Sequence, residues 1–155
     1  MRISESSRLQ VNRYVFFLTL FSTLIFIFSH SLASAAESGA ASEAVFTFLD
    51  RILGFLPFFS HAFVRKLAHF AEYALLGVHT CAALPLFFGG KYRKLWLPML
   101  LSVPVALIDE GIQLFVAGRA GLWTDVLIDC GGILFGALMA LLFMVLCKKR
   151  KEKAH

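Results

Sequence analysis

The stretch Val126–Cys147, VLIDCGGILFGALMALLFMVLC, decides which class of fold this chain can adopt. It carries one charged side chain, Asp129, and a basic segment follows it directly. A helix needs about 20 predominantly apolar residues to cross the hydrocarbon core of a bilayer. The stretch lacks the strict alternation of a barrel strand, so it predicts a transmembrane helix.

Working outward from this stretch, three further windows meet the same length requirement. Hydrophobic residues make up 59% of the 155 residues and charged residues 16%, whereas a soluble domain is about half apolar and a quarter charged. The chain is therefore predicted to be an all-α integral membrane protein, a four-transmembrane-helix bundle that forms one domain over residues 1–155. The predicted spans are residues 14–31, 67–88, 95–115 and 126–147.

The basic residues predict the orientation of these spans. Eleven of the 15 lysines and arginines lie near the two chain ends or in the loop 89–94. Such clusters mark the cytoplasmic side of a membrane, so both termini, including a basic tail at 148–155, are predicted to be cytoplasmic and the loop 32–66 to lie outside. Because these charges lie beside apolar runs, the net charge of +5 indicates membrane lipids as partners and no nucleic acid.

The first window has a second interpretation. Its basic residues, its apolar core and the small residues Ala33, Ser34 and Ala35 resemble a secretory signal peptide with its cleavage site. The Phe-rich run is long for the apolar core of such a peptide, which favours a retained helix. Under either interpretation, the segment that follows faces the cell exterior.

A Ser/Ala-rich linker is predicted at residues 34–42, followed by a short amphipathic helix at residues 43–55. Val45, Phe48 and Ile52 fall on one face of this helix. The pattern indicates an interfacial helix in the outer leaflet, between the first and second spans. A cap packed over the helix bundle fits the same pattern.

Ionisable and polar residues lie inside or against the apolar stretches, where they are costly and usually functional. At about 1.5 Å per helical residue, Glu72 and Glu110 each lie roughly 8 Å below the predicted outer boundary. The sequence thus predicts one outward-facing polar layer that forms a binding site. Its residues are Lys66, His69, Glu72 and Tyr73 at the second span, Asp109, Glu110 and Gln113 on the third, and Arg119, Asp125 and Asp129 at the fourth.

The charges of this layer do not balance, because five carboxyls face two fixed cations, Lys66 and Arg119. A desolvated site cannot cheaply hold the excess, so some carboxyls are protonated or a cation completes the site. No HExxH or comparable motif occurs, so the sequence assigns no metal and no cofactor, although a bound cation stays open. If the protein is an enzyme, the candidate catalytic residues are Glu110, Asp109 and His69.

Purely structural roles compete with these assignments. His69 fits a hydrogen bond to a neighbouring helix, Asp125 fits an N-cap of the fourth helix, and Asp129 fits a structural ion pair with Arg119 or Lys66. Gly132 and Gly136 form a GxxxG pattern, which predicts close packing between helices.

The ordered set of motifs resembles the VanZ-like membrane protein family. The first motif is Lys66-x-x-His69-Phe70-x-x-Tyr73-x-x-Leu76-Gly77, and Phe28-Ser29-His30-Ser31 precedes it in the family's order. The second is Asp109-Glu110-x-x-Gln113-x-Phe115, followed by Arg119, Asp125, Gly132 and Gly136. One departure is Asp129, where the family usually has Asn, and this puts in doubt any role that needs an amide there.

The resemblance implies a protein of the bacterial cell membrane that affects susceptibility to teicoplanin-type glycopeptide antibiotics. The expected role is binding of a lipid-linked cell-wall precursor, or of the glycopeptide itself, at the outward-facing polar site. A membrane-embedded hydrolase or transferase acting on a lipid-linked substrate is the alternative. An ion- or proton-coupled transporter is a third hypothesis, weakened because no charged path leads inward from the layer.

Overall fold

The structure, a computed structural model, describes residues 5–53, 60–87, 96–119 and 121–153. These residues form five α-helices and no strand, which confirms the all-helical prediction. The helices are α1 (Glu5–Leu32), α2 (Ala35–Leu53), α3 (His61–Phe87), α4 (Trp96–Gln113) and α5 (Trp123–Lys153). Three of them, α1, α3 and the part of α5 up to Arg150, are long and apolar enough to cross a membrane.

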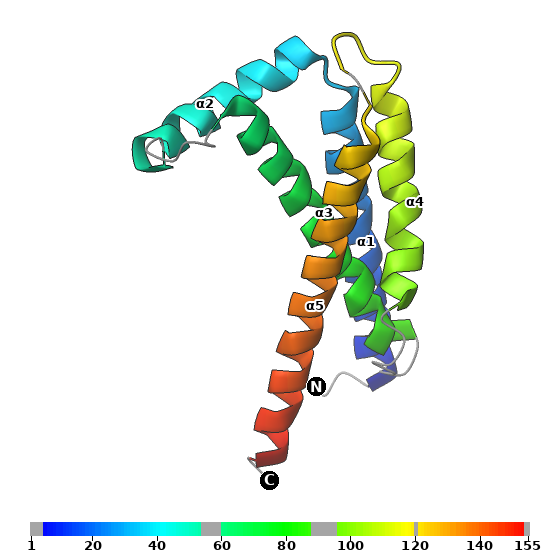
Figure 1. Cartoon of the computed structure of the whole chain (residues 1–155). Coiled ribbons are helices and arrows are strands. Elements are labelled where there is room, and N and C mark those ends of the chain that lie inside the picture. The colour runs from blue at the N-terminus through cyan, green and yellow to red at the C-terminus, as the bar shows by residue number, and fades with distance from the viewer. Residues whose placement is uncertain (1–4, 54–59, 88–95, 120, 154–155) are drawn as a thin grey trace.

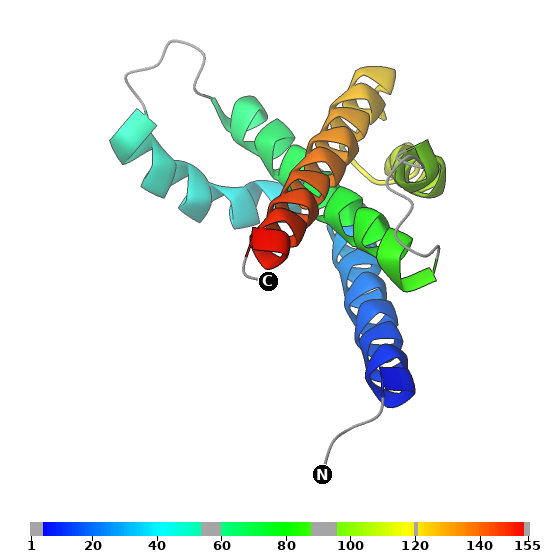
Figure 2. The ribbon, with the colours of Figure 1, turned by 90° about the horizontal axis from the view of Figure 1, so that it is seen from below.

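The helices α3 and α5 form the centre of the molecule. Figure 1 shows α3 crossing α5, with α1 and α4 beside them, and the view from below in Figure 2 shows α2 and α4 on opposite sides of this crossing. The start of α1 and the end of α5 lie at the same end of the molecule (Figure 1). We call the opposite end, where α1 and α4 end and α5 begins, the polar end.

Small residues bring α3 and α5 into backbone contact. A Cβ atom at Gly136 would overlap the backbone carbonyl of Ala74, and one at Gly132 would overlap that of Phe70. In the reverse direction, a Cβ at Gly77 on α3 would overlap the carbonyl of Ile133. The close packing predicted from the GxxxG pattern is thus confirmed, and only glycine fits at these positions.

Four helices share one apolar core. Ile27 of α1, Leu76 of α3, Ala106 of α4 and Ile133 of α5 are each at most 1% exposed and form a single cluster with Tyr73. Outside this core, large apolar side chains such as Phe17, Phe21 and Phe143 are more than half exposed. An apolar exterior of this kind suits lipid rather than water.

The linker predicted at residues 34–42 is wrong, because α2 already begins at Ala35. Ser34 and Glu37 form a reciprocal N-terminal cap. The backbone N and the Oγ of Ser34 each donate to Glu37 Oε2 at 2.8 Å, and the Glu37 backbone N donates to Ser34 Oγ at 3.3 Å. This capping box satisfies the free amides that a helix start exposes, so it stabilises the start of α2.

Other helix bounds also differ from the predicted ones. Helix α1 begins at Glu5, before the predicted span, and α5 continues to Lys153, so most of the predicted basic tail is helical. Helix α4, the described part of the predicted third span, ends at Gln113. The predicted loop 89–94, and the predicted end of the amphipathic helix at Phe55, lie outside the described residues.

Candidate functional site

The polar end gathers buried polar side chains from α1, α3, α4 and α5. The end of α1, the first half of α3, the end of α4 and the start of α5 all lie there (Figure 1). We keep the name polar layer for these side chains, a set that overlaps with the predicted one but differs from it. It comprises Ser31, His69, Glu72, Asp109, Glu110, Gln113 and Asp129, each of them buried except for the partly exposed His69.

Asp109 is fully buried in the polar layer and accepts hydrogen bonds on both oxygens. Ser31 Oγ donates to Oδ1, and Gln113 Nε2 donates to Oδ2 at 3.2 Å. Asp109 and Gln113 are four residues apart on α4, so they share one helical face, while Ser31 reaches them from the end of α1. These two donors hold the carboxyl in a fixed orientation.

Asp129 is also fully buried, yet neither of its oxygens has a hydrogen-bond partner within the described part of the chain. Its nearest basic group is His69, whose Nδ1 lies 3.9 Å from Asp129 Oδ1 and likewise has no hydrogen-bond partner there. Asp129 forms no ion pair with Arg119 or Lys66 among the described residues, so the structural pairing considered for it is wrong. Together with Asp109, these residues offer three ligand atoms within 4.8 Å of one another.

Lys66 and Asp125 form an ion pair between α3 and α5. Lys66 Nζ donates to Asp125 Oδ1 at 2.8 Å. Because α5 begins at Trp123, Asp125 lies inside the first turn and is not the N-cap considered for it. A carboxylate in the first turn also interacts favourably with the helix dipole.

Glu110 fastens the loop before α5 to α4. Its Oε2 accepts a hydrogen bond of 2.9 Å from the backbone N of Leu122. Its Oε1 is buried and has no partner among the described residues. Gly118, in the same loop, has a φ of 76°, a conformation that glycine adopts without strain.

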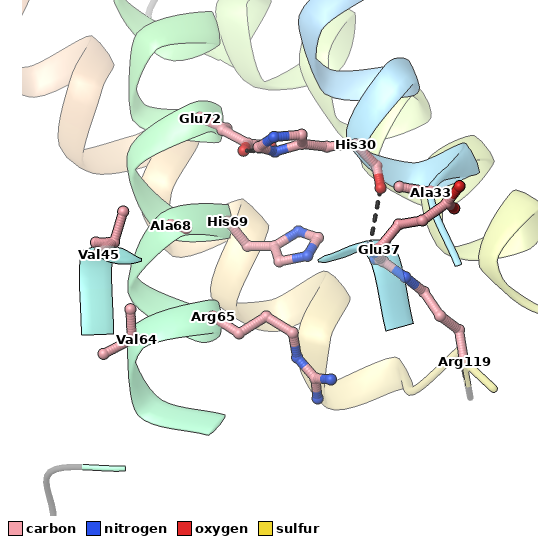
Figure 3. Close-up of a pocket in the computed structure, with 10 residues that line it drawn as sticks. All are labelled: His30, Ala33, Glu37, Val45, Val64, Arg65, Ala68, His69, Glu72 and Arg119. Carbon is pink, nitrogen blue, oxygen red and sulfur yellow. Dashed lines mark hydrogen bonds and ion pairs between the residues drawn. The ribbon is translucent and has the colours of Figure 1, made fainter. Parts of the chain in front are cut away.

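A cavity of about 290 Å³ opens beside the polar layer. It is lined by His30, Ala33, Glu37, Val45, Val64, Arg65, Ala68, His69, Glu72 and Arg119. In Figure 3, Arg65 and His69 project from α3 toward this space, with His30 and Glu72 together on one side and Arg119 on another. The cavity thus has both basic and acidic groups on its wall.

Two contacts connect α1 to the other walls of the cavity. His30 Nδ1 lies 2.6 Å from Glu72 Oε1, and Arg119 Nη2 donates to the His30 backbone carbonyl at 2.9 Å. The second contact is the dashed line in Figure 3. His30 therefore joins the end of α1 to α3 through its side chain and to the loop before α5 through its backbone.

Arg119 has unused hydrogen-bonding capacity. Its Nη1 atom is buried and has no partner within the described ranges. Burial lowers the pKa of the Arg119 guanidinium, and the charge of Arg65 lowers it further, while the nearby carboxylates oppose this. An arginine stays cationic in a protein, so the cavity holds a desolvated positive charge that an anion would stabilise.

The predicted site residues other than Tyr73 fall into three sets, and His69 and Glu72 belong both to the cavity wall and to the polar layer. His69, Glu72 and Arg119 line the cavity, whereas Lys66 and Asp125 pair with each other and Asp109, Glu110, Gln113 and Asp129 lie in the polar layer. Tyr73 is fully buried in the apolar core, and its hydroxyl has no partner in the described structure.

Sequence reasoning assigned no site role to four residues that belong here: His30, Ser31, Glu37 and Arg65. His30 and Ser31 end the first apolar run, at the depth predicted for the polar layer, and this position was the signal that could have found them. Glu37 was detectable as the third residue after Ser34. Arg65 gives no such signal, because it differs from Lys66 only by a rotation of about 100° around α3.

The fold and the site define an all-helical membrane protein with a buried polar layer and a charged cavity at one end. A family model described as VanZ/LLP1 matches residues 14–144, and the chain belongs to this family. The predicted resemblance to VanZ-like proteins is thereby confirmed. No curated protein and no solved structure matches the chain.

Proposed function

We propose that this VanZ/LLP1 protein acts in the bacterial cell envelope by binding the anionic group of a lipid-linked envelope component in the cavity at its polar end. A lipid-linked cell-wall precursor fits this description, and binding it would affect susceptibility to teicoplanin-type glycopeptides. The observation that carries the proposal is the cavity wall, which combines Arg65 and Arg119 with His30 and His69.

The chemistry of the wall favours an anion with a hydrocarbon tail. The guanidinium groups of Arg65 and Arg119 match phosphate or carboxylate oxygens, and Arg119 Nη1 has no partner in the described structure. Val45 lies on the same wall, and Phe48 and Ile52 follow on the exposed apolar face of α2. The apolar face of α2 and the cavity therefore form one continuous surface, which would hold the tail and the anionic head of one lipid.

The proposed topology has four spans, α4 in addition to α1, α3 and α5, with both termini in the cytoplasm. The start of α1 and the basic end of α5 lie at the same end of the molecule (Figure 1), which agrees with the distribution of lysine and arginine. The cavity is lined by residues of the opposite, polar end. We place α2 in the outer membrane interface. A fluorescent protein fused to the C-terminus is expected to fluoresce, and a periplasmic phosphatase in the same position to be inactive.

Helix α1 is proposed to be retained rather than cleaved. Cleavage near Ala35 would remove His30 and Ser31, which contact Glu72 and Asp109. The intact mass of protein purified through a C-terminal tag decides this point. A mass that lacks the first 30 or so residues would support the signal-peptide interpretation instead.

Neighbouring residues of α3 provide a matched test of the binding proposal. Arg65 is exposed and lines the cavity, whereas Lys66 pairs with Asp125. Purified protein is titrated with a lipid-linked cell-wall precursor in nanodiscs. Arg65→Gln is expected to weaken binding by about tenfold or more, the size of a lost charge-assisted hydrogen bond. Lys66→Gln is expected to change affinity by less than about threefold.

The same two variants are then compared for teicoplanin susceptibility at equal expression. Arg65→Gln should reproduce the susceptibility of a deletion strain, and Lys66→Gln should resemble the wild type. Equal affinities for the precursor in wild type and Arg65→Gln would reject the cavity as the binding site. Lost binding with unchanged susceptibility would keep the site and reject its link to glycopeptides.

An enzyme is the second candidate function, and one observation favours it. His69 lines the cavity and has the carboxyl of Asp129 3.9 Å away, so the imidazole is placed to exchange a proton with a bound substrate. Asp109 and Glu110 do not line the cavity, which makes them weaker candidates for that role. An enzyme predicts that purified protein converts the precursor to products, and that His69→Gln abolishes conversion while binding remains.

A further inference from the structure

We propose that His69, Asp109 and Asp129 form a binding site for a divalent transition-metal cation such as Mn²⁺ or Zn²⁺. This site lies in the polar layer rather than in the cavity wall alone, and it goes beyond the proposed binding of a lipid-linked anion. The two proposals are independent, because a metal is measured on the protein without any lipid ligand.

The geometry supports three ligands from three helices. One atom each from His69, Asp109 and Asp129 lies within 4.8 Å of the others, and the His69 and Asp129 atoms are 3.9 Å apart. Two ligands on opposite sides of one ion with bonds of about 2.1 Å are about 4.2 Å apart. Small side-chain rotations are therefore enough to bring the three atoms onto one ion.

The second, independent observation is the set of unused atoms that face this group. Asp129 is 0% exposed, and both of its oxygens lack a hydrogen-bond partner in the described part of the chain. His69 Nδ1 is buried and equally without a partner. A buried carboxyl with no donor is costly, and a bound cation would remove that cost on both oxygens.

Asp109 has the support that metal-binding carboxylates usually have. Ser31 and Gln113 donate to its two oxygens and fix its orientation, while each oxygen keeps a further lone pair. Groups that hold a ligand in this way contribute strongly to metal affinity. Ser31 and Gln113 are thus positioning residues for the proposed site.

The charge and the donor set select the kind of cation. Asp109 and Asp129 would bind a metal in their deprotonated forms, which together carry two negative charges, and the fixed cations Lys66 and Arg119 are directed to Asp125 and to the His30 carbonyl. A divalent ion neutralises both carboxylates in a region of low dielectric. One imidazole with two carboxylates suits Zn²⁺ or Mn²⁺ better than the all-oxygen sites typical of Ca²⁺ and Mg²⁺.

The test uses the full chain, purified in detergent through a tag that contains no histidine and stripped with EDTA. The protein is titrated with Mn²⁺ by electron paramagnetic resonance, and bound Zn²⁺ is counted by elemental analysis after removal of free metal. The expected result is about one ion per chain and a melting temperature that rises with metal concentration. If neither Mn²⁺ nor Zn²⁺ binds at about one ion per chain, the proposal is overturned.

Two aspartates on one face of α5 provide the variant and its control. Asp129→Asn is expected to weaken metal binding at least tenfold, whereas Asp125→Asn, one turn away and paired with Lys66, should change it less than about threefold. Equal loss in both variants would overturn the proposal, because it would reflect general charge and not ligation. If Asp129→Asn does not purify as a monodisperse protein, His69→Gln and Asp109→Asn take its place with the same expected loss.

Infrared spectroscopy separates a metal from a proton. The proposal predicts that adding Mn²⁺ shifts a carboxylate stretching band and that this shift is lost in Asp129→Asn. A protonated carboxyl band that disappears in Asp129→Asn and is unaffected by metal would show that a proton occupies the group, and would overturn the proposal.

Discussion

The middle and the polar end of the α3–α5 pair are built from opposite chemistry. In the middle, Gly77, Gly132 and Gly136 bring the two backbones into contact, each glycine against a backbone carbonyl of the other helix. About one to three turns closer to the polar end, the same helices carry the Lys66–Asp125 ion pair and the unpartnered groups of His69 and Asp129. One part of the interface therefore holds the two helices in place, and the other presents polar groups at the positions that this contact sets.

We expect the largest loss of stability from a substitution in the middle of the α3–α5 pair. Gly136→Ala places a Cβ onto the backbone of Ala74, which cannot yield as a side chain would, and we expect a loss of about 3 kcal/mol or more in unfolding free energy. Gly131→Ala is the matched control on the same helix. Its Cβ would lie 3.7 Å from the Phe70 ring, and alanine favours a helix, so stability should stay equal or rise slightly.

Unfolding in mixed micelles with increasing denaturing detergent measures both glycine variants. If both substitutions cost the same, the backbone contact between α3 and α5 is not what holds the middle together.

A smaller effect is expected at the polar end from Ser31→Ala. The substitution removes a donor from the fully buried Asp109 and should cost about 2 kcal/mol, the usual penalty for a buried acceptor that loses its partner. Ser29→Ala, on the same helix with its hydroxyl bonded only to the Phe26 carbonyl, is the control and should be nearly neutral. Thermal unfolding followed by circular dichroism compares the two, and equal melting temperatures for wild type and Ser31→Ala would argue against the contact.

The Lys66–Asp125 pair should contribute less again. Lys66 is 39% exposed, so solvent screens the pair and a coupling energy of about 1 kcal/mol is expected. The measurement is a double-mutant cycle of Lys66→Ala, Asp125→Ala and the double variant. A coupling energy near zero would mean that these charges do not help to hold α3 against α5.

The smallest effect concerns the start of α2 and depends on pH. Hydrogen bonds from Ser34 lower the pKa of Glu37 below its ordinary value of 4.5. Because the folded pKa is lowered, the contribution of this carboxylate is complete above the ordinary value and is lost as pH falls through the folded pKa. Amide hydrogen exchange at Glu37, corrected for the intrinsic rate, should accelerate only in that acidic range, and Ser34→Ala should exchange faster already at neutral pH.

Much of the fold could be predicted from the sequence, because the membrane imposes a simple rule of length and hydropathy. Val126–Cys147 and the windows at residues 14–31 and 67–88 needed only that rule, and the GxxxG pattern correctly indicated close helix packing. Helix bounds were less accurate where polar residues extend a helix beyond the apolar run, as at Glu5 and Lys153. The cap formed by Ser34 and Glu37 was present in the sequence but was overlooked in a segment rich in small residues.

The sequence could predict that the polar residues of the site gather at one end of the helices, but not which of them pair. Helical rise indicates that Glu72 and Glu110 lie at the same level, yet it does not show that Lys66 pairs with Asp125 while Arg65 lines the cavity. Those choices depend on the rotation of α3 against its neighbours, which the contacts of Gly77, Gly132 and Gly136 determine. The role of His30 likewise depends on where α1 ends in space, which a single span cannot reveal.

The contact at Gly132 also fixes how α5 is rotated about its own axis. Gly132 lies against the backbone carbonyl of Phe70, the residue next to His69, and three residues from Asp129. The position of the Asp129 carboxyl around α5 therefore follows from this backbone contact. Inserting a single residue between Asp129 and Gly132 would turn that carboxyl by about 100° around α5 while the backbone contact of Gly132 with Phe70 stayed in place. The three-residue spacing between Asp129 and Gly132 therefore sets the direction in which this carboxyl points from α5.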